Sequence, residues 1–206
     1  RHERGACAEV LHHQLKETGI NTSLSSVKRT LDRCGLLKKR SPWKRYHPHV
    51  ERPYPQKPGD LVEIDTIHLM VNAHRRIYVY VLIDVYSRWV YARAYEKMSG
   101  VATLHFVREA QRKASFKFDM LQSDHGPEFG KWFVTQIKKK HRYTRIGKPN
   151  DNAHIERFNR TIQEKCIDMT PKIVPILNVE IAKYLQYYSH ERPHMSLQFK
   201  TPMQLL

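Results

Sequence analysis

The sequence predicts an α/β fold in which a mixed sheet is flanked by helices and preceded by a small all-α module. Three stretches with strand character, 61–67, 77–83 and 89–94, follow one another after Pro58. The middle stretch is almost continuously apolar, as expected of a central strand that is buried on both faces. Helical and strand patterns then alternate along the chain, which favours helices packed on a mixed sheet.

Positive charge is concentrated in the first 57 residues, which hold 13 Lys and Arg against 5 Asp and Glu. The whole chain has a formal charge of +16 and a pI near 9.9. Such a charge favours a polyanionic partner, with nucleic acid ahead of an anionic membrane surface. No window approaches the roughly 18 apolar residues of a spanning helix. We therefore expect a cytoplasmic, nucleoid-associated protein with DNA and no membrane as its partner.

The first 40 residues predict a helix-turn-helix module. Apolar residues recur at helical spacing in two stretches, which end at Gly19 and Gly35. The second helix exposes polar groups suited to phosphates and base edges in a major groove. The residues predicted to contact DNA here are Ser25, Ser26, Lys28, Arg29 and Arg33. An ordinary helical hairpin with a solvated face is the alternative.

Residues 41–57 mix basic, aromatic and proline residues without periodicity, and they predict an extended basic linker. The linker either follows a DNA backbone or is a charged tether.

The domain 58–206 contains the predicted sheet. Its remaining predicted elements are a helix over 101–110, a strand over 120–123, a helix over 128–140, a strand over 143–146, a helix around Glu156 and a helix over 181–188. The three cysteines are too few and too scattered for a disulfide framework or a four-ligand zinc site, so we expect them to be reduced.

Three acidic residues stand out by their positions. Asp65 lies in the middle of the first strand, Asp124 lies at the end of the fourth, and Glu156 lies one turn inside a helix that Asp151 or Asn152 can cap. Each has an ordinary explanation: a strand acid paired with a lysine, a turn-forming Asp, and a first-turn acid that stabilises its helix by a few tenths of a kcal/mol. Together they can converge at one edge of the sheet, where like charges repel unless hard cations neutralise them.

Five motifs carry a family resemblance. They are EIDTI around Asp65, IDVYSRWVYA from Ile83, LQSDHGPEF around Asp124, GKPNDNAHIERFNRTIQE around Glu156 and YYSHERPHMSLQFKTP from Tyr187. In this order, over roughly residues 58–203, they resemble the insertion-sequence transposases related to retroviral integrases. Residues 5–40 further resemble the helix-turn-helix that commonly precedes that core.

The resemblance implies a ribonuclease-H-like core with a mixed five-stranded sheet and an Asp-Asp-Glu metal triad. Carried over residue by residue, the catalytic metal ligands are Asp65, Asp124 and Glu156. They would hold two Mg²⁺ ions, which Mn²⁺ could replace, with Asp65 as the bridge. The implied activity is DNA strand cleavage followed by strand transfer, on transposon ends and a target duplex. Synapsis of two DNA ends implies a homodimer or a larger assembly.

Other residues near the triad are candidates for supporting roles. Lys148, Asn159, Arg160 and Lys165 are predicted DNA contacts around the helix of Glu156. For Lys148 and Lys165, a role as solvated surface lysines is the alternative. His125, Glu128 and Asn152 could position a phosphate or orient a carboxylate, although half or more of these neighbours are better explained as loop and cap residues. The segment 190–194, His-Glu-Arg-Pro-His, is read as packing against the core because no cysteine accompanies its two histidines.

Two features of the sequence differ from the usual pattern of these transposases and leave other functions open. Only 31 residues separate Asp124 from Glu156, a few fewer than in related families, and we expect a shortened loop over 138–142 to absorb the difference. The chain begins with Arg1 and leaves no room for a helix before the helix-turn-helix, so we expect a fragment. The main alternative is a catalytically inactive DNA-binding remnant or regulator with the same fold. A ribonuclease-H-type nuclease that acts on RNA–DNA hybrids is a further alternative function.

Overall fold

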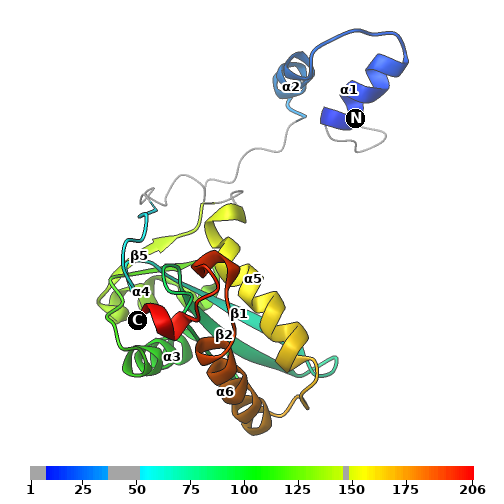
Figure 1. Cartoon of the computed structure of the whole chain (residues 1–206). Helices are drawn as coiled ribbons and strands as arrows, with labels where there is room; N and C mark the ends of the chain where they lie inside the picture. Colours follow the sequence, from blue (N-terminus) through cyan, green and yellow to red (C-terminus); the bar gives the residue numbers. More distant parts are fainter. Residues whose placement is uncertain (1–7, 37–51, 146–148) are drawn as a thin grey trace. The chain divides into compact units, whose positions relative to one another are not determined.

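The computed structural model describes residues 8–36, 52–145 and 149–206. The chain divides into two compact units, residues 1–47 and 48–206 (Figure 1). This division falls inside the segment 41–57 that we predicted as a linker, and residues 41–51 of that segment lie outside the described residues. Within the described ranges, no helix is long and apolar enough to cross a membrane.

The first unit contains two helices, α1 (Ala8–Glu17) and α2 (Leu24–Arg33). Gly19 has φ +85°, a left-handed conformation that ends α1 and that glycine adopts without strain. The hydroxyl of Ser23 caps α2 by accepting a hydrogen bond from the N–H of Ser26. A small apolar core joins the helices, built from Ala8, Val27 and Leu31 with Leu11, Leu15, Leu24 and Leu36 around them.

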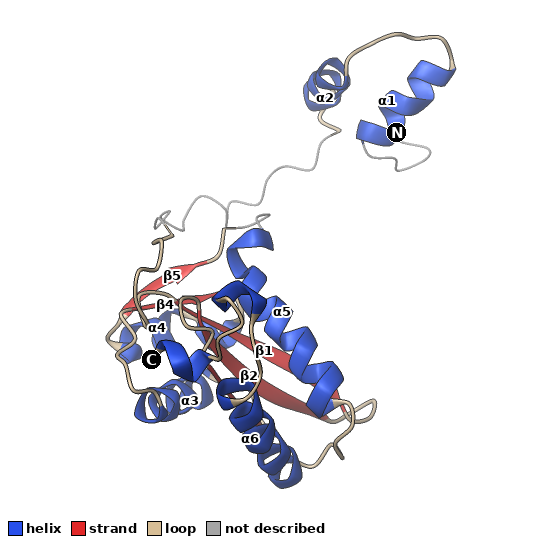
Figure 2. Ribbon diagram, in the orientation of Figure 1, coloured by secondary structure: helices blue, strands red, loops and turns tan. Residues whose placement is uncertain are grey.

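The second unit is built on one mixed five-stranded sheet (Figure 2), and this confirms the predicted fold class. The strands are β1 (Val62–Met70), β2 (Arg76–Asp84), β3 (Val90–Tyr95), β4 (Met120–Ser123) and β5 (Lys140–Tyr143). Their order across the sheet is β3-β2-β1-β4-β5. The first three form an antiparallel meander, whereas β4 lies parallel to both β1 and β5.

Helices cover both faces of the sheet. On one face, α5 (Ala153–Ile162) and α6 (Val174–His190) pack on Ile77, Val79, Val81 and Ile83 of β2. On the other face, α3 (Gly100–Lys113) and α4 (Lys131–Ile137) pack on a core that contains Tyr80 and Leu82. Because each face of β2 meets a helical layer, its sequence is apolar almost throughout. A π-helical turn, Gln163–Ile167, continues α5, and two 3₁₀ turns, Met195–Leu197 and Pro202–Leu205, follow α6.

The segment 128–140 differs from the predicted single helix. It begins as a 3₁₀ turn, Pro127–Phe129, continues as α4 and ends at Lys138, which has φ +51°. Strand β5 then starts at Lys140, three residues before the predicted start, and pairs with β4 in the register Met120↔Lys140. Pairing with β4 therefore outweighs the local helical pattern. Of the segment 138–142 expected to be a shortened loop, only Lys138 and Lys139 connect the two elements.

Candidate active site

Two of the three predicted acids come together because β1 and β4 are parallel neighbours. Glu63 is opposite Gln122 in the sheet register, and continuing that register places Asp124, just after β4, beside Asp65 in β1. Asp65 lies on the sheet face that α5 covers, since Ile67 on the same face of β1 belongs to the core around α5. The structure thus brings Asp65 and Asp124 to one edge of the sheet.

The carboxylate of Asp65 is held from two sides and is destabilised as an anion. Its Oδ1 accepts a 2.8 Å hydrogen bond from the N–H of Thr66, and its Oδ2 accepts one of 2.8 Å from Nδ2 of Asn159 on α5. Burial raises the pKa of Asp65 to about 6, and the negative charges of Asp124 and Glu128 add to the rise. Asp65 therefore lies in a buried, electronegative environment that disfavours its own ionisation.

Asp124 and Glu128 lie on either side of Gly126. The N–H of Gly126 donates a 2.9 Å hydrogen bond to Oδ1 of Asp124. A Cβ at this glycine would lie 2.5 Å from Oε2 of Glu128 and 3.1 Å from Oδ1 of Asp124. Asp124 is exposed, whereas Glu128 is buried. The absence of a side chain at Gly126 is what lets the two carboxylates approach each other.

Glu156 is not part of this group as the structure stands. It lies in the first turn of α5, is exposed, and makes no hydrogen bond or ion pair with another described residue. It precedes Asn159 by three residues, so the two side chains share a flank of the helix. Over residues 8–36, 52–145 and 149–206, no three His, Cys, Asp or Glu side chains lie close enough together to hold a metal ion. The predicted triad is therefore brought together only in part.

Comparisons with known proteins agree with this fold. Two models described as integrase core domain match the chain, over residues 55–149 and 137–202, and together they cover more than half of it. The chain belongs to the integrase core domain family. Its sheet and flanking helices form the ribonuclease-H-like fold of that family.

Three known proteins illustrate the similarity. The insertion element IS407 uncharacterized 31.7 kDa protein of Burkholderia multivorans is 25% identical over 202 residues, which cover 93% of this chain and 72% of that protein. A putative integrase of Spiroplasma virus SpV1-C74 is 25% identical over 178 residues, and the match covers 74% of this chain but only 49% of the viral protein. The HTLV-2 integrase catalytic core domain, solved with magnesium, has a TM-score of 0.59 at 20% identity and covers 74% of this chain and 99% of its own.

In this integrase core, helix α5, which carries Glu156, is capped by a residue that we did not predict from the sequence. We predicted a cap from Asp151 or Asn152, but the side chain of Asn152 makes no capping hydrogen bond, and Asp151 accepts hydrogen bonds from Arg145 instead. The carboxylate of Glu63, 92 residues earlier in the chain, accepts a 3.0 Å hydrogen bond from the N–H of Ile155 and so caps the helix. The signal present in the sequence is a second carboxylate two positions before Asp65, on the same face of the strand.

The predicted DNA contacts of α2 are mostly on the surface. Ser25, Lys28, Arg29 and Arg33 are exposed, while Ser26 is half-buried and hydrogen-bonds with the capping residue Ser23. Lys28 forms a 2.8 Å ion pair with Glu9, which offsets its charge. On and after α5, Arg160 and Lys165 are exposed, Asn159 is engaged with Asp65, and Lys148 lies outside the described residues.

Several supporting candidates have structural roles in the integrase core. His125 stacks on Tyr143 at 4.9 Å and contacts the carbonyl of Thr144. The amide oxygen of Asn152 accepts a hydrogen bond from Gln122. In the segment after α6, His194 packs edge-on against Tyr188, and Arg192 lies 5.2 Å from the same ring. That segment therefore packs on the core, as predicted.

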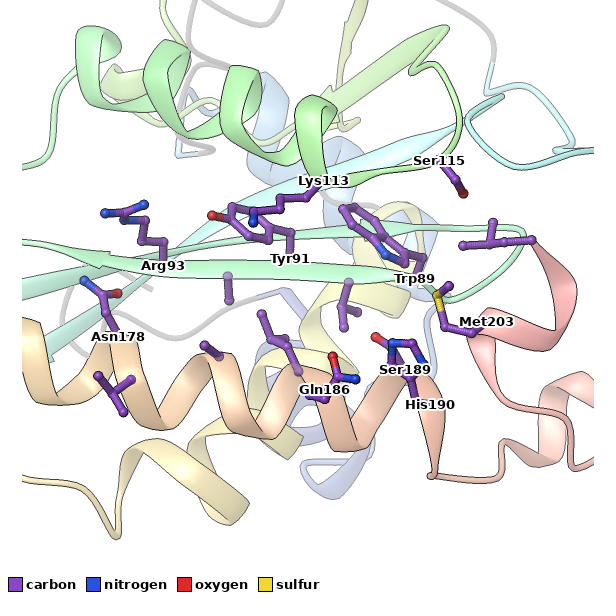
Figure 3. Close-up of a pocket in the computed structure, with 16 residues that line it drawn as sticks. Trp89, Tyr91, Arg93, Lys113, Ser115, Asn178, Gln186, Ser189, His190 and Met203 are labelled. Carbon is purple, nitrogen blue, oxygen red and sulfur yellow. The ribbon is translucent and has the colours of Figure 1, made fainter.

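A cavity of about 590 Å³ lies elsewhere, between β3 and α6 (Figure 3). Its lining includes Trp89 just before β3, Tyr91 of β3, Asn178 and Gln186 of α6, and Met203. None of the three predicted metal ligands lines it. The cavity therefore does not belong to the acidic site at the edge of β1 and β4.

Proposed function

We propose that this chain is a DNA transposase or integrase that cleaves a DNA strand and transfers the 3′ end to a target duplex, with Asp65, Asp124 and Glu156 as the ligands of two Mg²⁺ ions. One observation supports it above the others: the parallel pairing of β1 and β4 sets Asp124 beside Asp65, and the pKa of Asp65 is raised to about 6 by burial and by neighbouring carboxylates. Such a perturbed carboxyl at a sheet edge is typical of a functional site.

The donor set suits a hard divalent cation. Carboxylate oxygens are the ligands that Mg²⁺ prefers, and a cation between Asp65 and Asp124 would relieve the repulsion that raises the pKa of Asp65. Glu156 has to turn from its exposed position toward Asp65 to complete the set. It lies on the same flank of α5 as Asn159, which already binds Asp65, so a change of side-chain rotamer with a small shift of the helix is the movement required.

Different residues of the chain have different roles in the proposed reaction. Asp65, Asp124 and Glu156 would hold the paired divalent ions, which would supply positive charge at the scissile phosphate for attack by water and then by the freed 3′-hydroxyl. Asp65 has to be deprotonated to act as a ligand, and Asn159 keeps its carboxylate in a fixed orientation on β1. Exposed basic side chains on α2 and after α5 hold the phosphate backbone. Cleavage of two DNA ends together calls for a dimer or larger assembly, working on DNA in the cytoplasm.

A plasmid-nicking assay with Mg²⁺ or Mn²⁺ tests the proposal. We expect Asp65→Asn, Asp124→Asn and Glu156→Gln each to abolish nicking and strand joining, with DNA binding retained. Glu164→Gln is the matched control, because Glu164 is an exposed glutamate in the turn that continues α5, and this variant keeps full activity. If Asp65→Asn joins strands at the wild-type rate, the assignment of the ligands is wrong.

A second candidate is a DNA-binding remnant or regulator without catalytic activity. It is favoured by the exposed position of Glu156 and by the lack of a three-ligand group among the described residues. The nicking assay separates the two functions. Wild-type protein that binds DNA but nicks it with neither ion supports the remnant, and cleavage confined to RNA–DNA hybrids supports a ribonuclease.

A further inference from the structure

A row of three buried polar side chains crosses the sheet directly beside the acidic site. Glu63 of β1 pairs in register with Gln122 of β4, and Gln122 pairs with Arg142 of β5. The exposed fractions of these residues are 0%, 0% and 1%. Strands buried on both faces are ordinarily apolar, and burying a carboxylate or a guanidinium is costly unless hydrogen bonds compensate. A row of this kind therefore calls for a reason other than the stability of the sheet.

The partners of Glu63 all lie on other elements. Its Oε2 accepts the N–H of Ile155 in the first turn of α5 at 3.0 Å, and its Oε1 accepts from Nη2 of Arg52 at 2.9 Å. Nδ1 of His154 lies 3.4 Å from the same oxygen. The first N–H groups of a helix have no partner within the helix and attract negative charge. Glu63 thus supplies from β1 the cap that the turn before α5 lacks.

Gln122 and Arg142 hold the turn that leads into α5. Nε2 of Gln122 donates to the carbonyl of Asp151 at 2.5 Å and to Oδ1 of Asn152 at 3.1 Å. Arg142 donates to Oε1 of Gln122 and lies 3.5 Å from Oδ2 of Asp151. Three neighbouring strands therefore each contribute one side chain to the same helix start, and they fix it against the edge of the sheet that carries Asp65 and Asp124.

We propose that Glu63 is a positioning residue for the catalytic site, which acts by fixing the start of α5 and thereby the distance of Glu156 and Asn159 from Asp65. The inference rests on the proposed function. Glu63 lies two residues before Asp65 on the same face of β1, so one strand holds both the cap of the helix and the carboxylate that the helix must meet. Any slip of the helix start moves Glu156 relative to that carboxylate.

Two variants of Glu63 test this role in the full chain. Glu63→Met keeps the length of the side chain and removes the acceptor, whereas Glu63→Gln keeps an amide oxygen within reach of the N–H of Ile155. We expect Glu63→Met to lower the rate of Mn²⁺-dependent nicking at least about tenfold and to raise the Mn²⁺ concentration needed for half-maximal rate, as substitutions that disturb the orientation of ligands do. We expect Glu63→Gln to keep most of the nicking rate and to need a Mn²⁺ concentration close to that of the wild type.

Hydrogen–deuterium exchange gives a readout that does not depend on activity. In Glu63→Met, amide exchange is expected to accelerate at least about tenfold in residues 153–159 and to stay unchanged in α3 and β2, because the opening is local to α5. Gln111→Met is the control. Like Glu63, Gln111 bonds through its side chain to backbone of another segment, at the carbonyl of Phe116 and the N–H of Phe118, but it lies on α3. This control leaves the exchange of α5 and the Mn²⁺ requirement at wild-type values.

The outcomes separate the two proposals. If wild-type protein does not nick DNA, the proposed function fails, while selective exchange in α5 still supports the anchoring by Glu63. If wild-type protein nicks DNA and Glu63→Met does so at the same rate and Mn²⁺ requirement, the positioning role is overturned and the function stands. If Glu63→Met does not fold, Glu63→Asp replaces it, since this variant keeps the charge and is one methylene too short to reach Ile155. The same selective loss is expected of Glu63→Asp, and full activity would overturn the role.

Discussion

Asn159 on α5 donates a 2.8 Å hydrogen bond from its Nδ2 to Oδ2 of Asp65 in the middle of β1. The two residues are 94 positions apart in the chain. This bond joins the helix that presents Glu156 to the strand that presents the buried acid. It also favours the anionic form of Asp65, against the burial and the neighbouring charges that raise its pKa to about 6.

Replacing this amide by a carboxylate is expected to destabilise the protein in a pH-dependent way. In Asn159→Asp, a carboxylate would lie within hydrogen-bonding distance of Asp65, beside Asp124 and Glu128. We expect the free energy of unfolding at pH 8 to fall by about 1–2 kcal/mol, and the loss to shrink toward pH 5 as one carboxyl of the pair is protonated. Thermal unfolding across this pH range measures it. Asn72→Asp is the control, because the side-chain oxygen of Asn72 accepts two backbone N–H groups and Asp serves equally there.

Removing the charge of Asp65 is expected to stabilise the metal-free protein while abolishing cleavage. The folded-state pKa of about 6 lies above the ordinary value of 3.8 for an aspartate side chain. Ionisation of Asp65 therefore costs stability as the pH rises from about 4 to 6, and the cost is complete above 6. We expect Asp65→Asn to raise the free energy of unfolding by about 1–2 kcal/mol at pH 7.5, with no gain at pH 4. A melting temperature that does not rise at pH 7.5 would contradict the electrostatic account of the site.

Divalent cations are expected to stabilise the wild-type protein and not its Asp65 variant. A ligand that binds only the folded state adds about 2.7 kcal/mol at a concentration one hundred times its Kd. We therefore expect Mn²⁺ to raise the Tm of the wild type above that in EDTA, and to have little effect on Asp65→Asn. Thermal unfolding with increasing Mn²⁺ measures the difference. An equal rise in both proteins would indicate binding elsewhere.

The sequence predicted those parts of the molecule that depend on local pattern. The strand β4 was predicted with its observed bounds, because its residue pattern and the turn residues that follow it decide them. The cap of α5 could not be predicted, since Glu63 and Ile155 meet only through the parallel pairing of β1 with β4 and the return of α5 onto the sheet. The start of β5 was missed for the same reason: pairing with Met120 decides the structure of Lys140.

His141 is expected to limit stability in acid. Burial lowers the pKa of this histidine to about 4, and its ring packs at 4.6 Å from Tyr143 and 6.1 Å from Phe133. The folded-state pKa lies below the ordinary value of 6.5, so the neutral ring contributes stability above pH 6.5 that is lost as the pH falls toward 4. We expect His141→Gln to flatten this decline by up to about 1.4 kcal/mol per pH unit. The same change at the exposed His74 leaves the decline as it is in the wild type.

The basic face of α2 is expected to contribute to DNA affinity through its unpaired arginines rather than through Lys28. Lys28 is already neutralised by Glu9 at 2.8 Å, whereas Arg29 and Arg33 are exposed without an ion pair to another described residue. Each phosphate contact that is lost reduces the slope of log K against log salt by about 0.9. We expect Arg29→Ala with Arg33→Ala to reduce that slope by nearly two, and Lys28→Ala to change it by much less. Arg112→Ala, at an exposed position on α3, is the control. Fluorescence anisotropy over a salt series measures the slopes, and an equal reduction in the double variant and the control would show that α2 has no specific part in binding.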